Sequence, residues 1–171
     1  MLINLSDVLT SEGMQISREL PLEMTCFESR MGSFPIIASS PVSLRIRNAG
    51  AGKAKLDGGL KLTLQAGCDR CLTEVPVALD LQFDRTVVSG TEDVDADELG
   101  LTEDCQLDVE TFVHNEILVN WPGKILCRED CRGICPVCGQ DLNERECECD
   151  TFVPDPRMAV IQDIFNKNKE V

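Results

Sequence analysis

The stretch from Leu60 to Phe83, LKLTLQAGCDRCLTEVPVALDLQF, decides the fold. Apolar residues occupy every second position of residues 60–66 and again of residues 75–83, a period that predicts two half-buried strands. Cys68 and Cys71 lie between these strands, at the spacing of half a metal site. Because the connection is short, we expect the strands to pair antiparallel, with the two thiols near their turn.

The sequence around this stretch continues the same pattern over residues 1–88. Residues 42–47 alternate in the same way, and glycines separate the alternating runs. We therefore predict an α+β protein. It consists of an antiparallel curled sheet or small barrel, followed by helices and a cysteine-rich zinc knuckle. A short helix near Ser6 lies within the N-terminal, strand-rich part.

Two further parts follow the sheet. Residues 89–106 contain seven acidic residues and no basic one, which predicts a solvated linker, with a decoy for RNA or a contact for a basic protein as the alternatives. Residues 107–171 contain a predicted helix at 108–120, the cysteine cluster and a C-terminal helix that we expect to pack back on the sheet. The apolar stripe of the first helix leaves out His114, which we predict to be a surface residue.

The composition excludes several classes of protein. The 171 residues carry a formal charge of −14, which excludes a non-specific nucleic-acid coat. Only 4% of the residues are aromatic, which argues against a sheet that stacks RNA bases on exposed rings. Because the sequence has no long apolar run and no basic segment before an apolar N-terminal stretch, we expect a soluble cytoplasmic protein.

Ten cysteines point to a metal, because a reducing cytoplasm disfavours disulfides. Eight of them are predicted ligands: Cys68, Cys71, Cys127, Cys131, Cys135, Cys138, Cys147 and Cys149. The CPVCG segment at residues 135–139 has the pattern of a zinc knuckle. Either the upstream pair shares an ion with two cysteines of the cluster, connecting the sheet to the C-terminal part, or that pair binds no metal.

The chemistry of these ligands favours a structural metal. An all-sulfur site is closed and makes a poor Lewis acid, so we expect one or two structural zinc ions, with iron–sulfur ligation as the alternative. Cys26 and Cys105 are predicted to lie outside the metal sites, as a small core residue and a surface thiol. No acid–base pair, activated nucleophile or phosphate loop is visible, so we expect no enzymatic activity.

Four cations flank a glycine-rich connection that we predict to be a hairpin: Arg45, Arg47, Lys53 and Lys55. With a five-residue loop, Arg47 would face Lys53 and Arg45 would face Lys55 on the outer face of the sheet. Like charges directly opposite each other destabilise a sheet. We therefore expect them to be neutralised by a neighbouring carboxylate, Asp80 or Asp84, or by an anionic partner such as RNA phosphate.

Five motifs carry a resemblance to a known family: Cys68-Asp69-Arg70-Cys71-Leu72, NEILVNWP at residues 115–122, LCREDCRGICPVCG at residues 126–139, Leu142-Asn143, and Asp155-Pro156-Arg157. In these motifs the sequence resembles the YceD family of large ribosomal RNA subunit accumulation proteins of bacteria and plastids. The resemblance covers roughly residues 60–165.

The resemblance implies a non-enzymatic factor that supports accumulation of large-subunit ribosomal RNA. Its implied partners are pre-ribosomal large subunits, ribosomal RNA or a basic ribosomal protein, with no membrane and no small-molecule substrate. Some relatives lack the C-terminal cluster, and some carry His-x-His in place of Cys147 and Cys149, which fits structural zinc. Composition alone leaves a zinc-dependent enzyme or a thiol redox protein as the alternative.

Overall fold

The computed structural model describes residues 1–50, 52–88 and 105–149. Its elements are β1 (Leu2–Asn4), α1 (Ser6–Thr10), β2 (Gln15–Leu20), β3 (Cys26–Ser29), β4 (Gly32–Ser39), β5 (Val42–Gly50), β6 (Lys53–Gly67), β7 (Glu74–Val88), β8 (Gln106–Asp108) and α3 (Val109–Val119). The predicted C-terminal helix and nearly all of the acidic linker lie outside the described residues. Neither described helix has the length and apolar character needed to cross a membrane.

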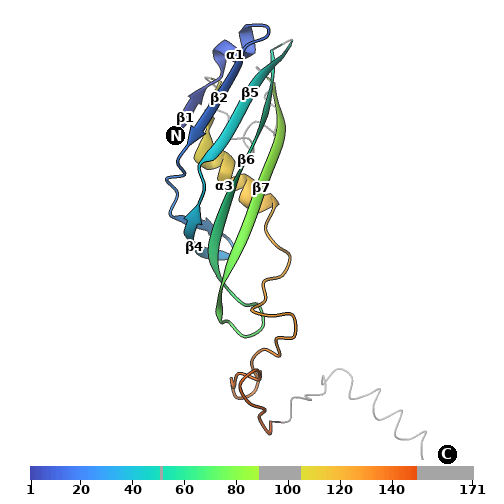
Figure 1. The fold of residues 1–171 in the computed structure, drawn as a ribbon. Coiled ribbons are helices and arrows are strands. Elements are labelled where there is room, and N and C mark those ends of the chain that lie inside the picture. Colours follow the sequence, from blue (N-terminus) through green and yellow to red (C-terminus); the bar gives the residue numbers. More distant parts are fainter. Residues whose placement is uncertain (51, 89–104, 150–171) are drawn as a thin grey trace, which may run out of the picture.

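β6 is the central strand of one antiparallel sheet (Figure 1). β7 pairs along one side of β6 over its whole length. The other side of β6 pairs with β5 and then with β4, and β2 and β3 pair with the far sides of β5 and β4. The predicted antiparallel sheet is confirmed. The alternative of a barrel is wrong for the described strands, because β7 and the β2–β3 side remain separate edges.

The sheet is irregular where β4 gives way to β5. Pro41 has no N–H group for a ladder, and the Ser40 hydroxyl instead accepts a hydrogen bond of 3.0 Å from the N–H of Lys61. Near this break, β6 contains Gly58, at which a Cβ atom would lie 1.9 Å from the carbonyl oxygen of Ser43. A side chain at this position would therefore collide with the neighbouring strand, so the sequence requires glycine here.

α3 packs on one face of the sheet (Figure 1). Asp108 caps its N-terminus by accepting a hydrogen bond from a backbone N–H of the first turn. Phe112 meets Phe83 of β7 edge to face, with ring centroids 4.9 Å apart. Among the described residues, Glu116 is the one buried charged side chain, and it accepts a hydrogen bond of 2.9 Å from Arg85 of β7. The predicted helix and its buried stripe are confirmed.

His114 connects α3 to the β3–β4 hairpin. Its ring lies 4.9 Å from that of Phe27, and its Nε2 lies 2.8 Å from the carbonyl oxygen of Glu28. Trp121 stacks on the same phenylalanine at 5.4 Å. The predicted surface histidine is therefore half-buried and contacts the core, because its side of α3 faces the β3–β4 hairpin.

Candidate metal centres

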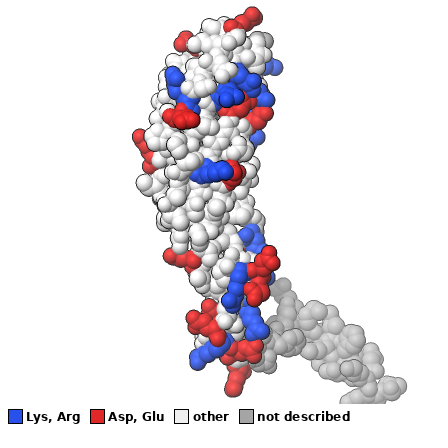
Figure 2. All heavy atoms as spheres, in the orientation of Figure 1, with Lys and Arg blue, Asp and Glu red and all other residues white. Residues whose placement is uncertain are grey.

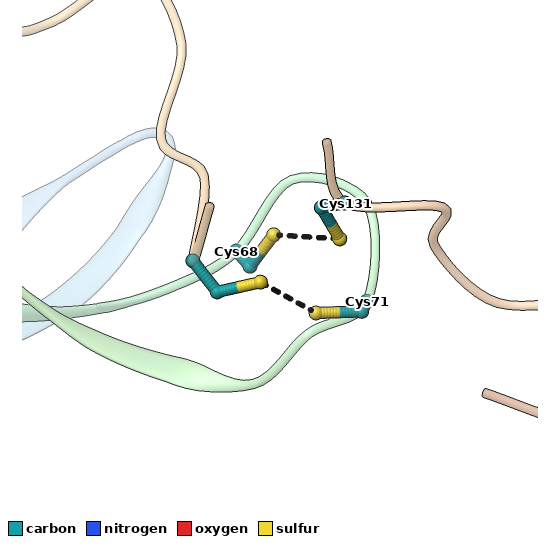
Figure 3. Close-up of side chains that lie close together, drawn as sticks. Cys68, Cys71 and Cys131 are labelled. Carbon is teal, nitrogen blue, oxygen red and sulfur yellow. Dashed lines mark hydrogen bonds between the residues drawn. The ribbon is translucent and has the colours of Figure 1, made fainter. Parts of the chain in front are cut away.

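The first centre lies at the turn between β6 and β7. The Sγ atoms of Cys68, Cys71, Cys127 and Cys131 all lie within 4.8 Å of one another. Figure 3 shows Cys68 and Cys71 on the turn and Cys131 on the chain segment that faces it. The thiols of the hairpin therefore meet two cysteines of the C-terminal cluster, which is the first of the two arrangements considered from the sequence.

The sulfur distances discriminate between a disulfide and a metal. Cys68 Sγ lies 3.8 Å from Cys131 Sγ, and Cys71 Sγ lies 3.5 Å from Cys127 Sγ. A disulfide requires about 2.05 Å. Tetrahedral zinc with Zn–S bonds of about 2.3 Å separates its sulfurs by about 3.8 Å. The four thiols are therefore spaced to hold one metal ion.

Local backbone geometry presents the two thiols of the turn. The N–H of Leu72 donates to the carbonyl oxygen of Cys68 at 2.9 Å, and the N–H of Cys68 donates to that of Thr73 at 2.8 Å. Leu72 adopts a left-handed backbone with φ 63°, which is costly for a leucine. This conformation closes the loop so that both side chains point to the same side.

The segment after α3 docks on this turn through reciprocal hydrogen bonds. The N–H of Asp69 donates to the carbonyl oxygen of Ile125 at 2.8 Å, and the N–H of Ile125 donates to Asp69 Oδ2 at 2.6 Å. The Arg70 guanidinium donates to the carbonyl oxygen of Cys131, and the Arg70 carbonyl oxygen accepts from Ile134 N–H at 3.1 Å. Both residues between the two turn cysteines thus hold the opposing chain in place.

The second centre lies entirely within the C-terminal segment. The Sγ atoms of Cys135, Cys138, Cys147 and Cys149 also lie within 4.8 Å of one another. The N–H of Gly139 donates to the carbonyl oxygen of Cys135 at 2.9 Å, and Gly139 has φ 73°. The N–H of Val137 donates to Cys135 Sγ at 3.4 Å. The turn repeats the geometry of the first centre, with glycine where the first has leucine.

Burial and the proximity of the other thiols prevent the thiols of the first centre from ionising together. Burial would raise the pKa of Cys68, but backbone N–H groups, with those of Arg70 and Cys71 foremost, lower it to about 6. Burial and the neighbouring thiols raise the pKa of Cys127 to about 12. Cys68 is thus prepared as a thiolate, and a cation is needed before all four thiols can be thiolates.

The thiols of the second centre also differ in their pKa values. Backbone N–H groups of Cys138 and Val137 lower the pKa of Cys135 to about 6. The neighbouring thiol of Cys138, together with burial, raises the pKa of Cys149 to about 12. Both sets of four sulfurs therefore fit a divalent metal that prefers thiolate ligands, by their spacing and by their chemistry.

Asn143 joins the two centres and was not recognised as a site residue from the sequence. Its Nδ2 donates to Cys131 Sγ at 3.4 Å and to Asp141 Oδ1 at 2.7 Å. Its Oδ1 accepts from the Arg132 N–H at 2.8 Å and from Arg128 at 2.9 Å. Its position between the two ligand pairs of the second centre could have marked it in the sequence, because an amide in such a loop can reach a thiolate.

The hairpin that carries the predicted cationic patch has a tighter turn than expected. Gly50 pairs with Lys53, so the connection has two residues instead of five. Gly50 adopts φ 82°, and its N–H donates to Asn48 Oδ1 at 2.8 Å, which allows the strands to continue to the turn. Arg47 consequently lies opposite Lys55, and Arg45 lies opposite Asp57, so the expected pairings of Arg47 with Lys53 and of Arg45 with Lys55 are both wrong.

Carboxylates of the sheet neutralise two of the four cations. Arg47 Nη2 lies 2.8 Å from Asp57 Oδ2, and Lys55 Nζ lies 2.8 Å from Asp84 Oδ2. Figure 2 accordingly shows blue and red side chains next to each other over the upper part of this face. The other two cations, Arg45 and Lys53, form no ion pair with any residue in the described ranges.

Comparison with known proteins places the chain in a family. Residues 56–165, more than half of the chain, match the model of "Large ribosomal RNA subunit accumulation protein YceD". An uncharacterized protein of Bacillus subtilis, YlbN, is 28% identical over 60% of this chain and 61% of its own length. An uncharacterized protein of Mycobacterium tuberculosis is 34% identical over 44% of this chain and 38% of its own length.

A plant relative has a descriptive name. "Large ribosomal RNA subunit accumulation protein YCED homolog 1, chloroplastic" of Arabidopsis thaliana is 27% identical over 57% of this chain and 40% of its own length. The chain thus spans less than two thirds of these relatives. No solved structure matches it. Since the family model covers both metal-ligand groups and the hairpin between β6 and β7, the chain belongs to the YceD family.

Proposed function

We propose that the protein is a non-enzymatic factor that supports accumulation of large-subunit ribosomal RNA during ribosome biogenesis. The observation that carries this proposal is the family match over residues 56–165, together with the name of the Arabidopsis relative. Its target is a pre-ribosomal large subunit or one of its basic proteins, because a chain with a formal charge of −14 is attracted to cationic surfaces.

Each group of four thiols holds one structural zinc ion in this proposal. Zinc supplies tetrahedral cross-linking there, and four protein sulfurs leave no open position for water or substrate. The first centre attaches residues 127–131 to the β6–β7 turn, and the second closes residues 135–149 on themselves. The role of these cysteines is therefore to fix the C-terminal segment against the sheet, not to perform chemistry.

Direct contact with RNA phosphate through the β5–β6 hairpin is a weaker part of the proposal, because Asp57 and Asp84 occupy two of its cations. Arg45 and Lys53 remain for such a contact. Replacing both with glutamate should weaken binding to ribosomal particles and lower the log–log salt slope by roughly one unit per lost contact. Unchanged binding by the folded variant would remove RNA from this surface.

The experiment for the main proposal measures mature large-subunit ribosomal RNA relative to small-subunit RNA in cells that lack this protein. We expect the ratio to fall and to recover with the wild-type chain. A variant with Cys68→Ser and Cys71→Ser should fail to restore it. The matched control replaces Cys26 and Cys105, which lie outside both groups of ligands, and should restore it.

Two outcomes would contradict the proposal. An unchanged ratio in cells without the protein would refute a role in ribosomal RNA accumulation. Site-specific cleavage or modification of precursor RNA by the purified zinc-loaded protein, lost in the Cys68 and Cys71 variant, would refute the non-enzymatic assignment.

A further inference from the structure

The outer edge of β7 has no partner among the described strands. β7 contains fifteen residues, Glu74–Val88, and pairs only with β6. It forms the right-hand border of the sheet in Figure 1. Strands in globular proteins usually contain about 5–6 residues. Long open edges are commonly protected by charges, proline or a covering segment, because an unprotected edge can pair with a further strand. An open edge of this length is therefore a candidate interaction surface.

The hydrogen bonds at the turn determine which backbone groups of β7 face outward. Cys68 donates to the carbonyl oxygen of Thr73, so these two residues form a hydrogen-bonded pair. Such pairs alternate with non-bonded pairs along an antiparallel ladder. Odd-numbered residues of β7 therefore bond to β6, and even-numbered residues turn their N–H and C=O groups to the free edge. The bond from Ser40 to the carbonyl oxygen of Lys61, the partner of Asp80, agrees with this assignment.

Proline is present at one of these outward positions and nowhere else in β7. Pro76 has an even number, so its missing N–H costs nothing in the ladder with β6. It blocks the beginning of the edge. From Ala78 to Thr86, five even-numbered residues keep their N–H groups, and no described segment forms a backbone hydrogen bond with them. This portion is open to a further strand.

Charge identifies the partner. The outward-facing residues of β7 include the carboxylates Asp80 and Asp84, with 54% and 65% of their side chains exposed, and no cation. Each carboxylate forms one ion pair with a lysine of β6, and its exposed side leaves it accessible to a second cation from a partner. They are four residues apart, about 13 Å along the strand. The formal charge of −14 further repels RNA and a second copy of this chain.

We propose that the edge of β7 between Ala78 and Thr86 binds an extended basic peptide segment as an additional strand of the sheet. Main-chain hydrogen bonds supply the affinity in this mode of binding. Cations four residues apart in the peptide reach Asp80 and Asp84 and set its register. The inference goes beyond the proposed role in ribosome biogenesis, and it is tested with purified components, so that either idea can fail without the other.

The first experiment uses a twelve-residue peptide of alternating lysine and threonine and the full chain. Titration calorimetry should detect binding that is lost when every second amide of the same peptide is N-methylated, because methylation keeps the charges and removes the donors. The variant Gln82→Pro removes one outward N–H and should weaken binding at least about fivefold. Gln82→Ala is the matched control and should bind normally.

Hydrogen exchange supplies a readout that does not depend on a variant. Adding the peptide should slow exchange at the outward amides of Ala78, Gln82 and Thr86, while the ladder amides of Leu79 and Leu81 stay as they were. Equal binding of the methylated peptide would overturn the proposal. So would protection of the same amides by single-stranded RNA or by self-association of the chain in the absence of peptide.

Discussion

Replacing Cys68 and Cys71 with serine should release the C-terminal segment from the sheet and remove one of two zinc ions. The two thiols are half of the first centre, and their loss leaves Cys127 and Cys131 as an incomplete ligand pair. The second centre has its own four ligands and should keep its metal. The expected zinc content therefore falls from two ions per chain to one.

The size of the effect follows from what else holds the segment. Four hydrogen bonds join Asp69 and Arg70 to residues 125–134. At about 1 kcal/mol each they contribute about 4 kcal/mol. A structural zinc ion contributes on the order of 10 kcal/mol. Most of the attachment is thus due to the metal, and the remaining hydrogen bonds should not hold the segment in place.

The sheet itself should survive this substitution, because its core is separate. The cluster formed by Cys68, Cys71 and Cys131 is distinct from the main core of the sheet, α1 and α3. Elemental analysis gives the zinc content, limited proteolysis shows whether residues 123–134 become cleavable, and near-UV circular dichroism reports on the main core. The variant with Cys26 and Cys105 replaced by serine is the control and should keep both ions.

Two results would refute this reasoning. A variant that keeps two zinc ions would mean that the turn cysteines are not ligands. A variant that loses one ion and stays resistant to protease in residues 123–134 would mean that the hydrogen bonds alone attach the segment, and that the metal is not the main cross-link.

Three further substitutions test other parts of the structure. Asn143→Ala removes a hydrogen bond to a thiolate of the first centre and should lower the zinc affinity of that centre by about 10-fold in chelator competition. A zinc affinity equal to that of the wild-type chain would show that Asn143 does not support the first centre. Arg85→Ala leaves the carboxylate of Glu116 buried without its cation and should lower the free energy of unfolding in urea by about 2 kcal/mol. The loss is smaller than for a fully buried pair because the arginine side chain is 41% exposed. An unchanged free energy of unfolding would contradict the packing of α3 on β7. Gly58→Ala places a Cβ against a backbone oxygen and should cost about 3 kcal/mol, whereas Gly67→Ala, with its nearest neighbour at 3.6 Å, should not destabilise.

Much of this fold could be predicted from local sequence patterns. Alternation in residues 60–66 and 75–83 predicted β6 and β7, because each strand buries one face against the core. The apolar stripe of the helix at 108–120 was equally informative, because it predicted the face that is buried against the sheet. The Cys-x2-Cys spacing indicated metal-binding turns, because that geometry is local to four residues.

The remaining features depend on contacts that no short segment specifies. The register at the β5–β6 hairpin differed from the prediction because the residues between Asn48 and Lys53 are compatible with turns of two lengths. Closure of the sheet was also undecided by the sequence, since it depends on whether two distant edges meet. The bond of Asn143 to the first centre joins loops of different centres, so no spacing rule predicts it.

An apolar core stabilises the sheet, whereas metal cross-links stabilise the C-terminal segment. Around the sheet, α1 and α3, about twenty side chains form one apolar core, whereas in residues 120–149 the buried apolar residues are Ile125 and two cysteines. A segment with so little apolar surface to bury requires a cross-link, and the eight thiols supply it. Metal removal should therefore unfold the segment and leave the open edge of β7 intact. Peptide binding at that edge and zinc binding at the turn should then be separable, and a chelated protein that still binds the lysine–threonine peptide would establish that they are.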